Sequence, residues 1–220
     1  MALASIVAFT NLKGGVGKTT LAVNISCALA AYGSVVLVDA DAQATATAWA
    51  AAGKLPITVE QLPLVGDGGR AIELWINRVV SLRTGAAYVA LDLPPNLGSA
   101  TTAALTVADL AVVPVPPSGM DLVATARALD LIRQARKVRR SDRPACLMVP
   151  SRVDRRTGAG REIEAVLSDF REPVAPAIVQ RSAHVDAFGA GQWLGDYAPR
   201  SAAHIEVLAL AALVKRMASR

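Results

Sequence analysis

Residues 10–20, "TNLKGGVGKTT", place glycines, lysines and threonines at a spacing that suits phosphate binding. The glycines allow the torsions that turn backbone N–H groups inward around an anion. A helix that begins near Lys18 points the positive end of its dipole at the same place. Lys18 can reach the β- and γ-phosphates, the Thr19 hydroxyl suits Mg²⁺ and Thr20 can donate to an α-phosphate. The cofactor-binding residues expected for ATP are Gly14, Gly15, Val16, Gly17, Lys18, Thr19 and Thr20.

The match to the phosphate-binding pattern G-x-x-x-x-G-K-[ST] fails at one position. Leu12 stands where that pattern requires glycine, and Lys13 follows at once. At the start of the loop, the Lys13 side chain is expected to leave its own phosphate site and point along the surface. It can then serve a phosphate bound by a second subunit, as an arginine finger supplied in trans does. The pattern predicts an intact phosphate site.

Short apolar runs alternate with stretches of helical spacing, and this alternation predicts a parallel sheet with helices on both faces. The expected strands are 5–9, 35–39, 88–92, 110–115, 145–149 and 174–179, with one extra strand at 57–62, and the expected helices are 19–32, 70–83, 99–108, 121–137 and 160–170. Without a linker, residues 1–220 are expected to form one domain of a doubly wound α/β fold. Asp39, Asp41 and Asp92 lie at strand ends, where such sheets bind ligands.

The last segment, 201–220, is expected to be a helix capped by Ser201. Residues 205, 208, 209, 212 and 213 form one apolar stripe, and the other faces are also largely apolar, so the helix is predicted to dock on the core.

The amino-acid composition limits the kinds of binding partner to expect. The 220 residues carry a formal charge of +5, which favours polyanions. Aromatic residues make up only 4%, which argues against stacking bases on an aromatic platform. No apolar run reaches the length of a membrane span, and the start of the chain reads as a strand and phosphate loop. A cytoplasmic protein is expected.

Three motifs resemble those of the ParA/MinD family of ATPases. "KGGVGKTT" is similar to the family's deviant Walker A motif, whose first lysine crosses a nucleotide-sandwich dimer; "VLVDADAQATATAW" (36–49) resembles switch I; and "VALDLPPN" (89–96) resembles the Walker B strand and switch II. The resemblance implies that Asp39 lies near the Mg²⁺ shell and that Asp92 holds Mg²⁺ through water, with Thr19 as the third metal-site residue. It also implies that Asp41 orients or activates the attacking water. Ala42, where the family usually has proline, is a departure.

Later segments match less tightly. "VVPVPPSGMDL" (112–122) is similar to a segment at the family's dimer face, and 149–160 resembles the loop beside the adenine, where Arg152 is expected on the base. The stretch 178–191 resembles the segment that closes over the base, which implies a nucleotide contact for Gln180. In this interpretation Lys13, Lys18 and Asp41 are the catalytic residues.

The position of the phosphate loop implies a branch of the family. The loop begins at residue 13, so no N-terminal helix-turn-helix domain is expected, and the chain resembles the short, ParF-like partition ATPases. Such proteins form a homodimer on ATP, coat the nucleoid without sequence specificity and hydrolyse ATP to ADP and phosphate when an adaptor stimulates them. The implied adaptor is a ParB-like or small centromere-binding protein. The DNA-binding candidates are Arg181, Arg200, Lys215 and Arg216, with Arg139, Arg140 and Arg143 as rivals.

Other functions stay open at this point. Similar ATPases position protein cargo such as carboxysomes or chemoreceptor clusters. A MinD-like membrane ATPase needs a detachable basic amphipathic helix, which the alanine-rich last segment does not suggest. An iron–sulfur reductase needs paired cysteines after Asp92, and the first cysteine there is Cys146. A metabolic P-loop enzyme gives Lys13 no evident task.

Overall fold

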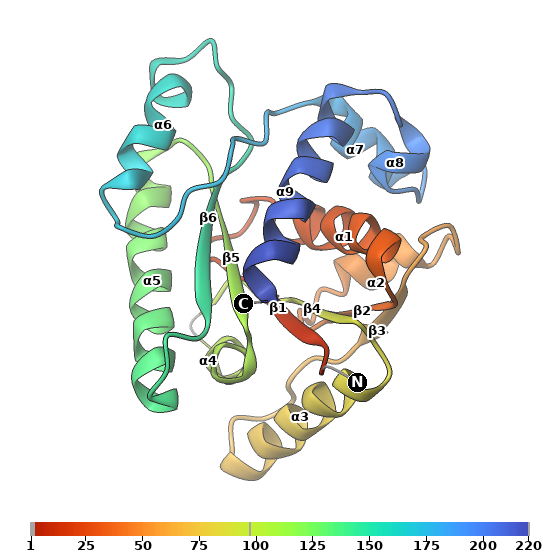
Figure 1. Ribbon diagram of the computed structural model, residues 1–220, viewed down its shortest axis with the longest axis vertical. Coiled ribbons are helices and arrows are strands. Elements are labelled where there is room, and N and C mark those ends of the chain that lie inside the picture. The colour runs from red at the N-terminus through yellow and green to blue at the C-terminus, as the bar shows by residue number, and fades with distance from the viewer. Residues whose placement is uncertain (1–2, 97, 220) are drawn as a thin grey trace.

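The computed structural model describes residues 3–96 and 98–219, and Figure 1 shows a central sheet between two layers of helices. The strands are β1 (Ser5–Phe9), β2 (Val35–Asp39), β3 (Thr58–Gln61), β4 (Tyr88–Asp92), β5 (Leu110–Val115) and β6 (Ala145–Pro150). Their order is β3-β2-β4-β1-β5-β6, and every neighbouring pair is parallel. The carboxyl ends of all six strands therefore meet at one edge of the sheet, and their starts meet at the opposite edge.

Helices cover both faces of this sheet. They are α1 (Lys18–Leu29), α2 (Thr45–Ala50), α3 (Gly69–Ser81), α4 (Ser99–Val107), α5 (Gly119–Arg139), α6 (Gly158–Ser168), α7 (Ser182–Gly189), α8 (Leu194–Tyr197) and α9 (Ala202–Ala218). Alternate residues of β1 enter different cores: Val7 and Phe9 pack with α1 and α9, whereas Ile6 and Ala8 pack with α3 and α4. A third cluster joins β5 and β6 to α5 and α6. Burial on both faces explains the continuous apolar runs of the strands.

Most of the predicted elements are confirmed. The uncertain strand at 57–62 exists as β3 at one edge of the sheet, and the fold is the doubly wound α/β arrangement that the alternation predicts. Three short helices, α2, α7 and α8, were not predicted. They are four to eight residues long, too short for a periodic pattern to stand out. No helix in the described ranges is long and apolar enough to cross a membrane.

The predicted strand at 174–179 is wrong. This segment lies along β6 but makes only isolated bridges, Met148 with Val174 and Val153 with Val179. The Ala175 N–H donates to the Met148 carbonyl, so Pro176 faces away from β6. Pro150 of β6 has no N–H to donate to the Ala175 carbonyl, and the next bond to β6 comes from Ile178, so no regular ladder forms.

The last helix docks on the core as predicted, but not through the apolar stripe noted in the sequence. Ile205 and Leu208 are 62% and 44% exposed, and residues 209 and 212 are exposed as well. The buried face of α9 consists instead of Ala203, Val207, Leu210, Ala211 and Val214. The helix is apolar nearly all round, so periodicity alone could not tell which face meets the core.

Candidate nucleotide site

The loop after β1 has the backbone of an anion cradle. Gly15 and Gly17 have φ angles of 74° and 95°, in the left-handed region that glycine adopts without strain. Gly17 also precedes α1 as its N-cap and offers no side-chain acceptor to the first turn. The N–H groups at the start of α1 are therefore left for a ligand, and the helix dipole favours a negative one.

Lys18 is held at the centre of this loop. Its Nζ donates to the Lys13 carbonyl oxygen at 3.1 Å, so the ammonium spans the cradle. Burial lowers the pKa of Lys18, while Asp92 and Asp41 oppose the shift. A buried ammonium whose acceptor is a neutral carbonyl is well placed to pair with phosphate oxygens.

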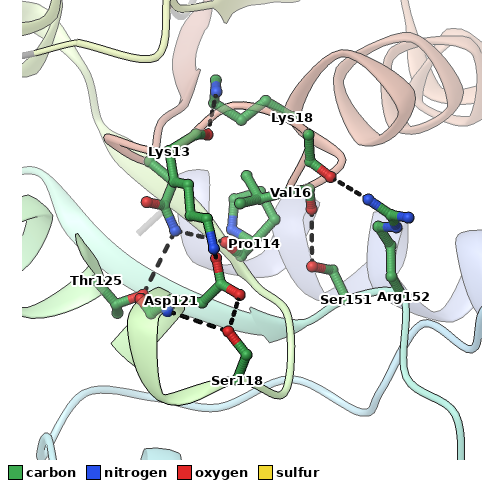
Figure 2. Close-up of polar contacts among 11 residues, drawn as sticks. Lys13, Val16, Lys18, Pro114, Ser118, Asp121, Thr125, Ser151 and Arg152 are labelled. Carbon is green, nitrogen blue, oxygen red and sulfur yellow. Dashed lines mark hydrogen bonds and ion pairs between the residues drawn. The ribbon is translucent and has the colours of Figure 1, made fainter. Parts of the chain in front are cut away.

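Lys13 points the other way. Its Nζ lies 2.8 Å from Oδ1 of Asp121 in the first turn of α5, as Figure 2 shows. Asp121 is almost buried, at 6% side-chain exposure, and its other oxygen accepts a bond from the Ser118 hydroxyl. Ser118 in turn caps α5 by accepting from the Asp121 N–H. The Lys13 side chain thus leaves its own phosphate loop, as the sequence predicted.

The segment after β6 fastens the loop from the other side. The buried Ser151 hydroxyl donates to the Val16 carbonyl at 2.8 Å, and Arg152 Nη1 donates to the Gly15 carbonyl at 2.5 Å (Figure 2). Each bond ties together segments more than 130 residues apart in the chain. The cradle is therefore shaped by tertiary contacts before any ligand arrives, which lowers the entropy cost of binding.

A cavity of about 1040 Å³ opens over the loop. The phosphate side is lined by Gly14, Gly15, Gly17, Lys18, Thr19, Thr20 and Asp41, and the opposite side by Arg152, Val153, Ile178, Val179, Gln180, Arg181 and His184. The volume is at the upper end of the range for small-molecule sites. The phosphate loop and the predicted base-side residues Arg152 and Gln180 therefore line one cavity.

Asp92 meets the chemical needs of a magnesium site. Its carboxylate is buried at the end of β4, and within the described residues neither oxygen accepts a hydrogen bond. Burial raises the pKa of Asp92 to about 7, with Thr19 and Lys18 opposing the shift. A buried carboxylate without partners is costly unless a cation joins it, so these residues fit Mg²⁺. No group of three or more His, Cys, Asp or Glu in the described chain could hold a metal alone, which suits an ion completed by phosphate oxygens and water.

Asp39 makes hydrogen bonds to α2 and to the turn before it, which the sequence did not predict. Its Oδ2 accepts bonds from the Thr47 N–H and hydroxyl at 2.8 and 2.9 Å, and its Oδ1 accepts from the Asp41 N–H at 3.3 Å. Asp39 therefore fastens α2 and the preceding turn to the end of β2. Asp41 is partly exposed, lines the cavity and accepts from the Gln43 N–H at 3.0 Å. The metal role of Asp39 and the catalytic role of Asp41 stay predictions.

The base-side residues are held by their own contacts. Arg152 adopts a φ of 52° while its guanidinium reaches the phosphate loop. The Gln180 N–H donates to the Val153 carbonyl, which fixes the backbone but leaves the side chain beside the cavity. Burial lowers the pKa of His184, so the imidazole is neutral near pH 7. The expected packing of Arg152 on a base stays a prediction.

The four DNA-binding candidates do not form one cluster. Arg181 pairs with Glu206 at 2.7 Å beside the cavity, and Arg200 is exposed just before α9. Lys215 lies 3.7 Å above the ring of Tyr32, and Arg216 is exposed in the last turn of α9. Arg200 and Arg216 are separated by the length of the helix, about 24 Å.

Sequence reasoning missed several residues that build the site. They are Asn11, which donates to the Pro114 carbonyl, Thr47, Asp121 as the partner of Lys13, and Ser151. Their partners come from segments distant in the chain. The S-x-x-D spacing of Ser118 and Asp121 was a readable helix-start signal, but its link to Lys13 was not.

Fold and site together define a P-loop nucleotide-binding protein. A family model described as "CobQ/CobB/MinD/ParA nucleotide binding domain" matches residues 7–192. The chain therefore belongs to this family, a class of P-loop nucleotide-binding ATPases.

Two relatives cover most of the chain. "Maintenance of carboxysome distribution protein A" from Halothiobacillus neapolitanus is 32% identical over 186 residues, which span 82% of this chain and 83% of that protein. "Sporulation initiation inhibitor protein Soj" from Bacillus subtilis is 31% identical over 236 residues, spanning 90% and 93%.

Two solved structures share the fold. A variant of McdA from Cyanothece, in complex with ATP, has a TM-score of 0.79 at 17% identity and covers 100% of this chain and 98% of that one. The septum site-determining protein MinD from Pyrococcus horikoshii, complexed with Mg-ADP, has a TM-score of 0.78 at 21% identity and covers 98% of each. At these identities the likeness concerns the fold alone.

Proposed function

We propose that the chain is an ATP-dependent dimerising switch that binds DNA without sequence specificity and positions a cargo. The observation that carries this proposal is the Lys13 side chain, which leaves its own phosphate loop and lies 2.8 Å from Asp121 on α5. Within one protomer this lysine neutralises Asp121 but lies away from the phosphate site of its own loop. A protomer that faces a second copy can turn the same ammonium toward the partner's phosphates.

The steps assigned to this chain's residues follow from their positions. The loop N–H groups and Lys18 bind the phosphates of ATP, while Thr19 and Asp92 would hold Mg²⁺, which would neutralise charge that develops on the transferred phosphoryl group. Asp41, which lines the cavity beside the loop, orients the attacking water. Lys13 from the second protomer adds a further positive charge beside Lys18, because the Lys13 of the same protomer points away from the site.

DNA binding follows from dimerisation by simple arithmetic. Two basic protomers held together double the number of phosphates neutralised, and the logarithm of affinity scales with that number. The cargo is a plasmid or chromosomal locus, recruited through a ParB-like or small centromere-binding adaptor, and the protein is cytoplasmic and nucleoid-associated. The relative named for carboxysome distribution supports a protein cargo as the second candidate.

Binding to random-sequence duplex DNA, with and without ATP and Mg²⁺, tests the proposal against a Lys13→Ala variant. ATP is expected to strengthen binding of the wild-type chain and to have no effect on the variant. Lys18→Ala is a second control that removes nucleotide binding itself. If ATP strengthens binding equally in the Lys13→Ala variant, Lys13 does not act across a dimer and the proposal fails.

A further inference from the structure

One surface of the protein gathers arginines at the edge of the sheet opposite the nucleotide site. Arg83 follows α3, Arg139 and Arg140 end α5, Arg143 precedes β6, and Lys215 and Arg216 lie in the last turn of α9. We call these six residues the amino-edge surface, because the segments that carry them lie next to the starts of the parallel strands. A five-residue strand separates this surface from the phosphate loop by about 17 Å.

Contacts with strand starts show that these side chains lie together. Arg83 pairs with Asp109 at 2.7 Å, and Arg143 Nη1 donates at 2.7 Å to the carbonyl of the same residue, which precedes β5. Arg139 donates to the Ala108 carbonyl, one position earlier. Three arginines from different segments therefore converge on two adjacent residues.

The end of α9 joins the same surface. Arg143 Nη1 also donates to the Met217 carbonyl at 3.3 Å, and the Ser5 hydroxyl at the start of β1 donates to the Ala218 carbonyl at 3.2 Å. Lys215 lies over Tyr32, three residues before β2 begins. In Figure 1 the last part of α9 accordingly lies beside β1. Two rival groups of DNA-binding candidates, the end of α5 and the end of α9, are thus one surface.

The charge of this surface is not neutralised within the protein. Its six cations are accompanied by two carboxylates, Asp109 and the exposed Asp142, which leaves +4 of the chain's formal +5. Arg139 and Arg143 bond to carbonyl oxygens, which hold the guanidinium groups in place without cancelling their charge. Burial lowers the pKa of Arg139, and Arg83 and Arg143 add to the shift by repulsion.

The negative ends of two helices offset only part of this positive charge. The carboxyl end of a helix carries about half a negative charge, so the ends of α5 and α9 together offset about one of the cations. Guanidinium groups held in fixed positions suit the oxygens of a phosphate backbone, which accept in a fork geometry.

We propose that the amino-edge surface binds the phosphate backbone of duplex DNA in a single protomer, in the absence of nucleotide. This inference goes beyond the ATP-dependent switch, because every residue of the surface belongs to one chain. In a dimer joined at the nucleotide edge, the two amino-edge surfaces face away from each other. Each dimer then presents two separate DNA sites, which can bridge two duplexes or engage two segments of one long DNA at once, and this second engagement on the same DNA supplies the ATP-dependent gain.

The test uses the full chain without nucleotide and a labelled random-sequence duplex of about 30 base pairs, titrated between about 50 and 200 mM salt. The variant Arg140→Asn with Arg216→Gln removes two exposed cations, and asparagine tolerates the left-handed φ of 50° at position 140. Arg70→Gln with Arg127→Gln is the matched control, because it removes the same charge from exposed helical positions elsewhere. Circular dichroism checks that both variants fold.

The wild-type chain and Lys13→Ala are expected to bind equally without nucleotide. The amino-edge variant is expected to bind roughly 10- to 100-fold more weakly at the lowest salt, with a salt slope smaller by about 2, and the control to bind like the wild type. The inference is overturned if the chain does not bind DNA without nucleotide, or if the variant and the control lose the same DNA affinity. It is also overturned if the surface binds polyglutamate, a protein-like polyanion, in place of DNA. If binding appears only with ATP, this inference fails and the proposed switch stands. If the chain binds DNA without nucleotide and ATP leaves that binding unchanged, this inference stands and the proposed switch fails.

Discussion

The ion pair between Lys13 and Asp121 makes the monomer–dimer equilibrium testable with one substitution. Asp121→Asn keeps the side chain's size but removes the charge that holds the Lys13 ammonium on its own protomer at 2.8 Å. If Lys13 must leave Asp121 to reach a partner's phosphates, the pair opposes dimerisation. Weakening the pair should therefore strengthen the ATP-dependent dimer.

The exposure of the two side chains sets the size of the effect. Lys13 is 37% exposed and Asp121 6%, so the pair lies between surface pairs, worth up to about 1 kcal/mol, and buried pairs, whose disruption costs about 3–5 kcal/mol. We take about 1 kcal/mol for each protomer, since solvent screens the lysine. Two pairs open per dimer, so the substitution should lower the dissociation constant of the ATP dimer about 30-fold, the equivalent of about 2 kcal/mol.

Sedimentation equilibrium with Mg²⁺ and a non-hydrolysable ATP analogue measures this constant. Asp130→Asn is the matched control, because it neutralises an aspartate on the same helix whose partner, Arg133, lies at the surface. Lys13→Ala combined with Asp121→Asn should give no dimer. An Asp121→Asn dimer no tighter than the wild type, with monomer nucleotide affinity intact, would refute the reasoning.

Further outcomes follow from the same geometry. Lys18→Ala should abolish nucleotide binding in calorimetry, because the ammonium spans the cradle. Asp41→Ala should trap the ATP dimer on DNA, and a light-scattering mass that stays monomeric with ATP would contradict its assigned role. Gly17→Ala should cost about 1–2 kcal/mol of unfolding free energy in urea, because its φ is 95°, whereas Gly14→Ala, where a Cβ meets nothing within 4 Å, should cost less. Burial lowers the pKa of His184, so the unfolded chain takes up this proton first as pH falls. Between pH 8 and 5.5 the wild type should therefore lose unfolding free energy relative to His184→Gln, a comparison in which the opposite contribution of Asp92, whose pKa is raised to about 7, is common to both chains.

Local pattern was enough for the elements and the phosphate loop. The spacing of Gly14, Gly15, Gly17 and Lys18 specifies the type of loop locally, so its residues were predictable, whereas the bonds from Ser151 and Arg152 that fasten it were not. Buried parallel strands read as short apolar runs because both of their faces are covered. The position of Lys13 at the start of the loop likewise indicated that its side chain points away from its own phosphate site.

Predictions failed where two local readings were equally good. The segment 174–179 has the composition of a strand, yet Pro150 of β6 has no N–H to donate to it and only isolated bridges form. The helix α9 is apolar on several faces, and only the shape of the core decides that Val207 is buried while Ile205 faces solvent.

The sequence by itself determined the chemistry, and the tertiary structure decided which groups meet. Residue types and spacing specified a phosphate loop, a second lysine and carboxylates at strand ends. Only folding brought Lys13 to Asp121, Ser151 to Val16 and Arg143 to the end of α9. Contacts between residues 74 to 135 positions apart depend on strand order and helix direction, which local physical preferences do not encode.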